Sequence, residues 1–494
     1  NYDDKGGIGF SKIGLGRTLR DYIKERPEGM IELFQKSIVH PKMHKYISFI
    51  IDGFSLSLKE GKKVDIIIFL SHFERILKNE IQINKEPIFW KEDTLRDTKK
   101  SIADFVYDNL NPDSIPIELH KRIWGLISLL LKEEDLTKEI EISNIERNWM
   151  PRDMCLNSVR GVATELVFIY LSWIKNFNPE YFNPEEIDIS KLIADAFLTL
   201  ESLLEDSLYT TRYIFGMNLN FLSSIDINWI KTNLLEIFPT SRDNLDYFEA
   251  AWAGFLDFNN IIFIMFKVLR PLYKYAINIM NNERVLIPFS QERLTNHLMV
   301  LYIYGLESLE HENSLFSQFF KKSNANARRS AIRSIGIHLQ HYINEEEIDK
   351  IKERLIKLME HRIKCAKVGN LEDFKEELFG FIFWFRNSIF EEKWMINQFL
   401  EVLRLLNGSI DVFYDVIDIL GNYTEDFPIQ VIECLDLIIK SEVKSGYFVY
   451  EEKFKNLLEK LLENENIEIK EKTVSLINFL IKLNFHNFSE LLRG

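Results

Sequence analysis

The chain has 494 residues, of which 46% are hydrophobic and 28% charged. This composition excludes a disordered protein, and the length exceeds what one compact core organises. Asp and Glu number 75 against 61 Lys and Arg, giving a net charge of −14, which opposes a broad contact with nucleic acid or an anionic membrane and favours a protein partner.

The N-terminal segment is rich in glycine, with Gly6, Gly7, Gly9, Gly14 and Gly16. We interpret residues 1–16 as a flexible entry to a first helix at Arg17, because no Gly-x-x-x-x-Gly-Lys-Ser/Thr run indicates a phosphate-binding loop. The tripeptide Gly61-Lys62-Lys63 lacks the hydroxyl of such a loop and predicts a turn between two helices. Since the chain begins with Asn1 rather than Met, we expect it to be part of a longer protein.

The rest of the chain is a series of amphipathic segments with helical period. In Asp246–Phe258 the apolar side chains recur on one helical face. The longest uncharged apolar run, Leu378–Phe385, falls short of the roughly 20 residues that span a bilayer, so no membrane segment is predicted. Five further helices are predicted towards the C-terminus: Glu391–Asn407, Ser409–Tyr423, Pro428–Ser441, Tyr450–Asn464 and Ile467–Leu483.

The spacing of these segments predicts the architecture. One helix pair spans roughly 35 to 40 residues, near the period of HEAT-type and tetratricopeptide arrays. We therefore predict an all-α, helical-repeat solenoid of antiparallel helix pairs. Residues 17–320 would form its N-terminal part and residues 321–494 its C-terminal part, as one continuous solenoid.

Sites for catalysis, metal ions or cofactors are not predicted. His40 and His44 have the i,i+4 spacing of a zinc site, but Pro41 interrupts it and the Glu of His-Glu-x-x-His is missing. His338 and His341 are a second close pair, but His338 lies among Ile335, Ile337 and Leu339, which favours a packed or surface imidazole. The cysteines, Cys155, Cys365 and Cys434, are far apart, so we expect buried free thiols in a reducing cytoplasm.

One basic stretch stands out against the acidic whole. From 321 to 333 the chain has five cations and no acid: Lys321, Lys322, Arg328, Arg329 and Arg333. These residues are the candidate contact for an acidic partner surface or a phosphate, and the alternative is a solvated loop that leads into an ordinary helix. Aromatic residues left exposed on a helical-repeat surface are a second source of binding anchors.

Five stretches carry a resemblance to a known family: Leu156–Asn176, Arg212–Pro239, Asp246–Asn259, Asn296–Leu309 and Phe379–Leu406. In unchanged order, they resemble the long C-terminal helical-repeat region of large bacterial STAND-type antiphage NTPases, the AVAST group. The resemblance covers most of the chain, from about Gly14 to Leu483. Within the first of these stretches, Asn157 is predicted to cap a helix that starts at Ser158, and Gly161 to allow a close helix neighbour.

The resemblance implies a function in antiviral defence. In that family the C-terminal arm is a sensor that recognises a phage protein, and recognition lets the NTPase oligomerise and activate an effector. This chain lacks the NTPase and effector, so it would contain no cofactor site, and oligomerisation would use domains outside it. The alternative is a non-immune helical scaffold that binds a host protein. An enzyme acting on nucleic acid is disfavoured by the net charge of −14 and by the absence of a metal-ligand motif.

Overall fold

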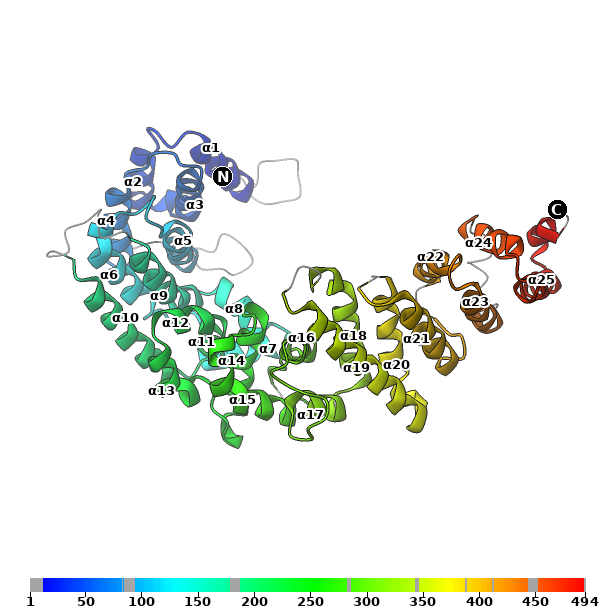
Figure 1. The fold of residues 1–494 in the computed structure, drawn as a ribbon. Helices are drawn as coiled ribbons and strands as arrows, with labels where there is room; N and C mark the ends of the chain where they lie inside the picture. Colours follow the sequence, from blue (N-terminus) through cyan, green and yellow to red (C-terminus); the bar gives the residue numbers. More distant parts are fainter. Residues whose placement is uncertain are drawn as a thin grey trace. The chain divides into compact units, whose positions relative to one another are not determined.

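The computed structural model describes residues 12–81, 83, 94–177, 187–281, 286–342, 346–386, 389–410, 413–442 and 452–492. Within these ranges the secondary structure is helical and contains no β-strand, so the protein has an all-α fold (Figure 1). The chain divides into two compact units: unit 1 is Asn1–Asn259 with Arg284–Phe289, and unit 2 is Asn260–Glu283 with Ser290–Gly494. The boundary expected between 320 and 321 lies inside a helix of unit 2, α17 (Leu315–Lys322).

Unit 1 contains the helices α1 to α14. Their bounds are α1 Lys12–Glu25, α2 Ile31–Val39, α3 Ile47–Lys59, α4 Ile66–Leu77, α5 Thr94–Asn109, α6 His120–Leu130, α7 Lys138–Ile145, α8 Pro151–Asn157, α9 Val159–Lys175, α10 Ile189–Leu204, α11 Tyr209–Met217, α12 Leu219–Ile225, α13 Ile227–Ile237 and α14 Leu245–Phe258.

Unit 2 contains the helices α15 to α25. Besides α17, they are α15 Phe266–Ile279, α16 Gln291–Ile303, α18 Ala325–His338, α19 Ile348–Val368, α20 Lys375–Phe381, α21 Glu392–Leu405, α22 Phe413–Tyr423, α23 Pro428–Glu442, α24 Glu452–Glu463 and α25 Ile467–Lys482.

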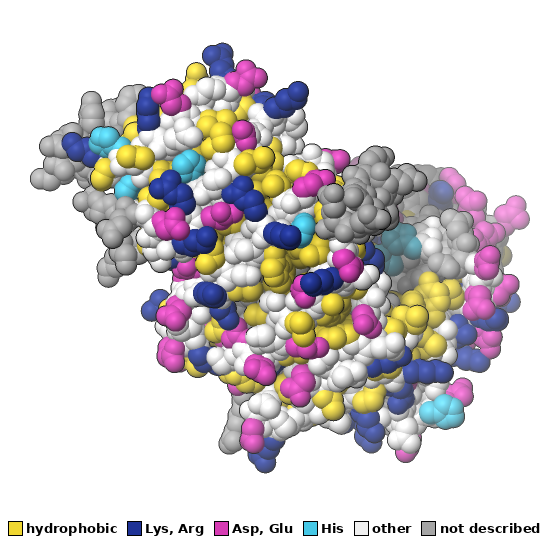
Figure 2. Space-filling view, turned by 90° about the vertical axis from the view of Figure 1, so that its left-hand side faces the viewer, with side chains coloured by type: hydrophobic (Ala, Val, Ile, Leu, Met, Phe, Trp, Pro, Cys, Tyr) yellow, Lys and Arg dark blue, Asp and Glu magenta, His cyan; other side chains and the backbone are white. Residues whose placement is uncertain are grey.

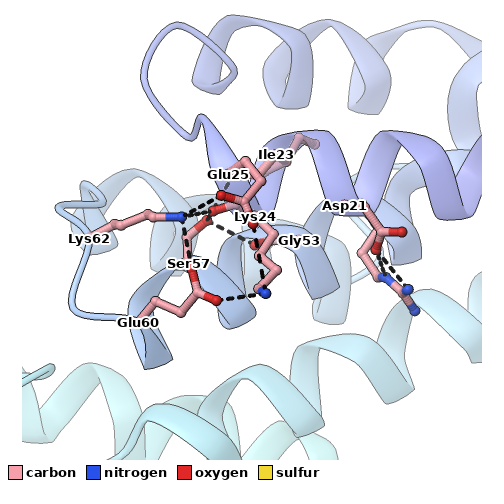
Figure 3. A network of polar contacts seen from close by, with 9 residues as sticks. Asp21, Ile23, Lys24, Glu25, Gly53, Ser57, Glu60 and Lys62 are labelled. Atoms are coloured by element: carbon pink, nitrogen blue, oxygen red, sulfur yellow. Dashed lines mark hydrogen bonds and ion pairs between the residues drawn. The ribbon is translucent and has the colours of Figure 1, made fainter.

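Helices α1 and α3 pack side by side, and their C-terminal ends meet (Figure 3). The Oγ atom of Ser57 on α3 lies 3.0 Å from the carbonyl oxygens of Ile23 and Lys24 at the end of α1. The Nζ atom of Lys62, in the turn after α3, donates to the same Lys24 oxygen at 2.6 Å. These two side chains satisfy carbonyls that have no partner within α1. The predicted turn at Gly61 is confirmed, with φ of 75°.

Glycine permits a close crossing of α11 with α14. A Cβ atom at Gly216 would lie 1.8 Å from the carbonyl oxygen of Ala251, and one at Gly254 would lie 2.1 Å from that of Tyr213. Asn259 then ties the two helices at their C-terminal ends, because its Nδ2 atom lies 3.0 Å from the carbonyl oxygen of Gly216. The backbones therefore pack directly against each other.

A buried carboxylate from α7 holds the N-terminus of α11. Glu141 accepts hydrogen bonds from the backbone N–H groups of Tyr209 at 2.7 Å and Thr210 at 2.6 Å. The Nζ atom of Lys138 is 3.5 Å from this carboxylate and 2.7 Å from the ring centroid of Tyr209. Burial lowers the pKa of Lys138 to about 8. The cluster joins α7 to α11 through charge and through the orphan N–H groups of a helix start.

In the C-terminal part of unit 2, three side-chain contacts between helices have similar spacings. The hydrogen bonds Trp394–Glu360, Arg404–Glu433 and Lys453–Asp418 join residues that are 34, 29 and 35 positions apart. They connect α19 to α21, α21 to α23 and α22 to α24, so each helix contacts the next but one. This spacing is consistent with the predicted period of roughly 35 to 40 residues.

The predicted helices agree with the structure to within a few residues. The segments predicted as Pro428–Ser441 and Ile467–Leu483 are α23 and α25, and the helix of Asp246–Phe258 is α14. Two details were wrong. Helix α1 begins at Lys12, ahead of the expected start at Arg17, while residues 1–11 lie outside the described ranges. Ser158, and not Asn157, caps α9, because its side chain accepts from the N–H of Gly161.

Candidate protein-binding site

The five cations of the basic stretch lie on two consecutive helices of unit 2. Lys321 and Lys322 end α17, and Arg328, Arg329 and Arg333 lie on α18. Asn324 begins α18 by accepting a hydrogen bond from the N–H of Ala327 at 2.8 Å. Lys321, Lys322 and Arg333 are exposed, whereas Arg328 and Arg329 are partly buried. The stretch therefore has two kinds of cation.

Arg328 belongs to a buried ion-pair network. Its Nε atom is 3.1 Å from Oε2 of Glu377 on α20, whose side chain is 1% exposed. Its Nη2 atom donates to the carbonyl oxygen of Asp373 at 2.6 Å, and its Nη1 atom donates to that of Ser323. The Nε and Nη2 atoms of Arg328 thus hold α18 against α20 and the segment before it, while Nη1 binds the end of α17. These contacts make this arginine structural.

Arg362 on α19 is the second cation bound to Glu377. Its Nε and Nη2 atoms each donate to a carboxylate oxygen of Glu377, the latter at 3.0 Å. The guanidinium is close to two aromatic rings, 4.6 Å from the centroid of Phe320 and 5.1 Å from that of Phe374. A carboxylate with two guanidinium partners is compensated for the loss of water, and the planar guanidinium suits stacking on rings.

A cavity of about 460 Å³ opens beside this network. Such a volume is in the range of ligand-binding pockets. We call it the Arg362 pocket, and its lining combines apolar and charged side chains: Leu309, Ser317, Phe320, Lys321, Arg328, His361, Arg362, Asp373 and Phe374.

Two donor groups of the Arg362 pocket remain available to a ligand. The Nη1 atom of Arg362 has no hydrogen-bond partner among the described residues, and the Arg362 side chain, which lines the cavity, is 10% exposed. Lys321 is exposed and makes no ion pair with a described residue. Burial, reinforced by Arg362, lowers the pKa of His361 and keeps its imidazole neutral near pH 7. The pocket thus presents Lys321 and Arg362 beside the exposed carboxylate of Asp373.

The other cations of the stretch lie outside this pocket. Lys322 donates to Oδ1 of Asn278 on α15. Arg329 pairs with Glu376. The guanidinium of Arg333 lies over the ring of Phe383, 4.6 Å from its centroid. Among the five residues predicted from sequence, Lys321 and Arg328 line the Arg362 pocket and the other three do not.

The sequence analysis missed Arg362, Phe374 and Glu377. Arg362 lies on α19, Glu377 lies on α20 and Phe374 directly precedes α20. They follow Lys321 and Arg328 by 34 to 56 positions, as their numbering shows. Arg362 sits on the buried face of α19 together with Leu358 and Met359. A charged residue on the apolar face of a predicted helix is the signal that indicates such a buried pair.

No metal site is formed by the described residues, in which no group of three or more His, Cys, Asp or Glu side chains could hold an ion. His44 is buried and its Nε2 atom lies 3.0 Å from the carbonyl oxygen of Ile38. The rings of His338 and His341 are 5.4 Å apart. The three cysteines are free thiols, of which Cys155 and Cys434 are buried.

The surface in Figure 2 carries Lys and Arg interspersed with Asp and Glu, and hydrophobic side chains lie between them. That face has no single-sign stripe of the kind that tracks a nucleic-acid backbone. Among the described helices none is long and apolar enough to cross a bilayer alone, and α8 with α9 meets those criteria only as a pair bent by 87°.

Comparisons with known proteins give little further information. A scan against protein-family models finds no match, and a search of curated proteins finds none either. Among solved structures, the chain is similar to the crystal structure of an engineered protein from the Northeast Structural Genomics Consortium. The two share 12% sequence identity, the alignment covers 82% of this chain and 98% of that one, and the TM-score is 0.26. A similarity at this TM-score is no basis for an argument about fold or function.

Proposed function

We propose that this chain is the sensor arm of a bacterial antiphage NTPase of the STAND type, and that it recognises a phage protein by shape and charge. The observation that carries the proposal is the Arg362 pocket on a scaffold of stacked helices. Binding energy at protein interfaces concentrates in a few aromatic and Arg residues in such pockets. Lys321, Phe320, Phe374 and Arg362 are a set of this kind.

The resemblance of the sequence to AVAST sensor regions supports the cellular setting. Under this proposal the protein acts in the cytoplasm and the chain itself catalyses no reaction and needs no cofactor. Its role is to bind the phage protein and thereby trigger an NTPase and effector that lie outside it. The chain as a whole is acidic, with a net charge of −14, so it would repel an acidic partner. A locally basic pocket would then select one acidic group on the surface of such a partner.

The gene tests the sensor-arm role directly. The reading frame that contains this chain should encode a P-loop NTPase ahead of Asn1, with an effector domain before it. A reading frame without an NTPase would refute the sensor-arm role and favour the alternative, a helical scaffold for a host protein.

A further inference from the structure

We infer that the Arg362 pocket binds one acidic side chain, an Asp or Glu of a protein partner, together with the apolar residues beside it. The ligand class rests on the proposed function, because it assumes a protein partner. The pocket chemistry stands on its own contacts.

The charge on the ligand follows from the donors that the fold leaves available. Glu377 occupies two of the three guanidinium nitrogens of Arg362, and Nη1 has no hydrogen-bond partner among the described residues. The exposed Lys321 lines the same cavity. Two cationic N–H donors of this kind favour an anionic group such as a carboxylate, since hydrogen bonds between charged partners are the strong ones.

The apolar part of the ligand is inferred from the apolar side chains that line the cavity. Leu309, Phe320 and Phe374 line the cavity, and its volume of about 460 Å³ exceeds the space needed for a carboxylate alone. The pocket also carries the exposed carboxylate of Asp373. This acid opposes a ligand with several negative charges, so the pocket fits a singly charged side chain flanked by apolar neighbours better than a phosphate.

The rigidity of the pocket favours this use. The rings of Phe320 and Phe374 contact the guanidinium of Arg362, and Glu377 holds it by an ion pair. A donor that is already held in place loses little entropy when it binds, which increases the affinity that each contact provides.

The test uses the full chain and a short fluorescent peptide with one Glu between apolar residues, compared with the same peptide carrying Gln. Fluorescence anisotropy should show binding of the Glu peptide that is at least about threefold tighter than that of the Gln peptide, and weaker in high salt. Equal affinities of the two peptides would overturn the inference. So would displacement of the Glu peptide by inorganic phosphate present at the peptide's own concentration.

Three variants give effects of different sign. Lys321→Glu should lower the affinity for the Glu peptide by about threefold or more, and Asp373→Asn should raise that affinity. Lys322→Glu is the matched control, because this neighbouring cation contacts Asn278 and does not line the cavity. The affinity of this variant for the Glu peptide should stay within about twofold of the wild-type value. Equal losses of affinity for Lys321→Glu and Lys322→Glu would indicate general charge attraction and would overturn the inference that the peptide binds in the Arg362 pocket.

The same variants separate this inference from the proposed function. Capture of a phage protein equally by wild type and Lys321→Glu would overturn the inference and leave the proposed function intact. Peptide binding with the predicted variant pattern, but without capture of any phage protein, would support the pocket and refute the proposed function.

Discussion

Glu249 of α14 makes the stability of unit 1 depend on pH. Glu249 is 1% exposed, and its Oε2 atom has no hydrogen-bond partner. Burial, reinforced by the charge of Asp246, raises the pKa of Glu249 from 4.5 to about 8. The side chain is therefore protonated near pH 7. We predict that Glu249→Gln, which resembles the protonated acid in shape, stabilises unit 1 at alkaline pH.

The sign and size of the effect follow from proton binding. Unfolded Glu249 loses its proton near pH 4.5, whereas the native side chain keeps it up to about pH 8. Between these values the native state binds more protons, so the free energy of unfolding falls as pH rises, by up to about 1.4 kcal/mol per pH unit. The whole window corresponds to at most about 5 kcal/mol, and relaxation of the site will reduce this value.

The assay is urea unfolding at several pH values between 5 and 8.5, followed by intrinsic tryptophan fluorescence. The fully buried Trp252, on the same helix as Glu249, is one of the eight tryptophans that contribute to this signal. The wild-type free energy should fall relative to that of Glu249→Gln as pH rises, and the gap should level off above about pH 8. Glu134→Gln serves as the control, because Glu134 is exposed and makes no ion pair with a described residue. Parallel curves for wild type and Glu249→Gln would refute the reasoning.

Three further stability predictions use urea unfolding followed by circular dichroism. Gly216→Ala should destabilise by about 1–3 kcal/mol or more, because its Cβ would lie 1.8 Å from the Ala251 oxygen. Gly125→Ala, with nothing within 4 Å of its Cβ, should stabilise the protein by about 0.5–1 kcal/mol. Equal changes in the free energy of unfolding for Gly216→Ala and Gly125→Ala would contradict the close packing of α11 against α14. Glu141→Gln should lower the free energy of unfolding by about 1–3 kcal/mol, because an amide cannot accept both N–H groups of α11 as well as a carboxylate does. An unchanged stability would contradict the proposal that Glu141 caps α11. Arg362→Ala should cost about 3–5 kcal/mol by leaving Glu377 buried with fewer partners, whereas Arg333→Ala should stay within about 0.5 kcal/mol; the reverse order would contradict the assignment of structural and exposed cations.

The all-α class and most helix positions could be predicted from sequence, because an amphipathic period of 3.6 residues is a local property. Segment Ile467–Leu483 shows this, since its apolar residues at helical spacing are the buried face of α25. Helix starts were less predictable. Gly14 and Gly16 suggested a flexible entry, yet both lie within α1; Gly16 is where a Cβ would meet the ring of Phe49 at 2.5 Å.

The candidate site could be predicted only in part, because its residues come from different helices. The run of basic residues at 321–333 indicated the right region, and it includes Lys321, which lines the Arg362 pocket. Charge alone did not separate the structural Arg328 from the exposed Arg333, since that distinction depends on Glu377 of another helix. A pairing between positions almost fifty residues apart has no local signal in one sequence.

Recognition of a foreign protein is tested most directly by immobilising the chain and exposing it to lysates of phage-infected and uninfected bacteria. A captured phage protein should then bind the purified chain directly in isothermal titration calorimetry. The account predicts that a phage-encoded protein is enriched from the infected lysate only, and that Lys321→Glu reduces its affinity while Lys322→Glu does not. Enrichment of the same host protein from both lysates, with no phage protein bound, would contradict the account and identify the chain as a host scaffold.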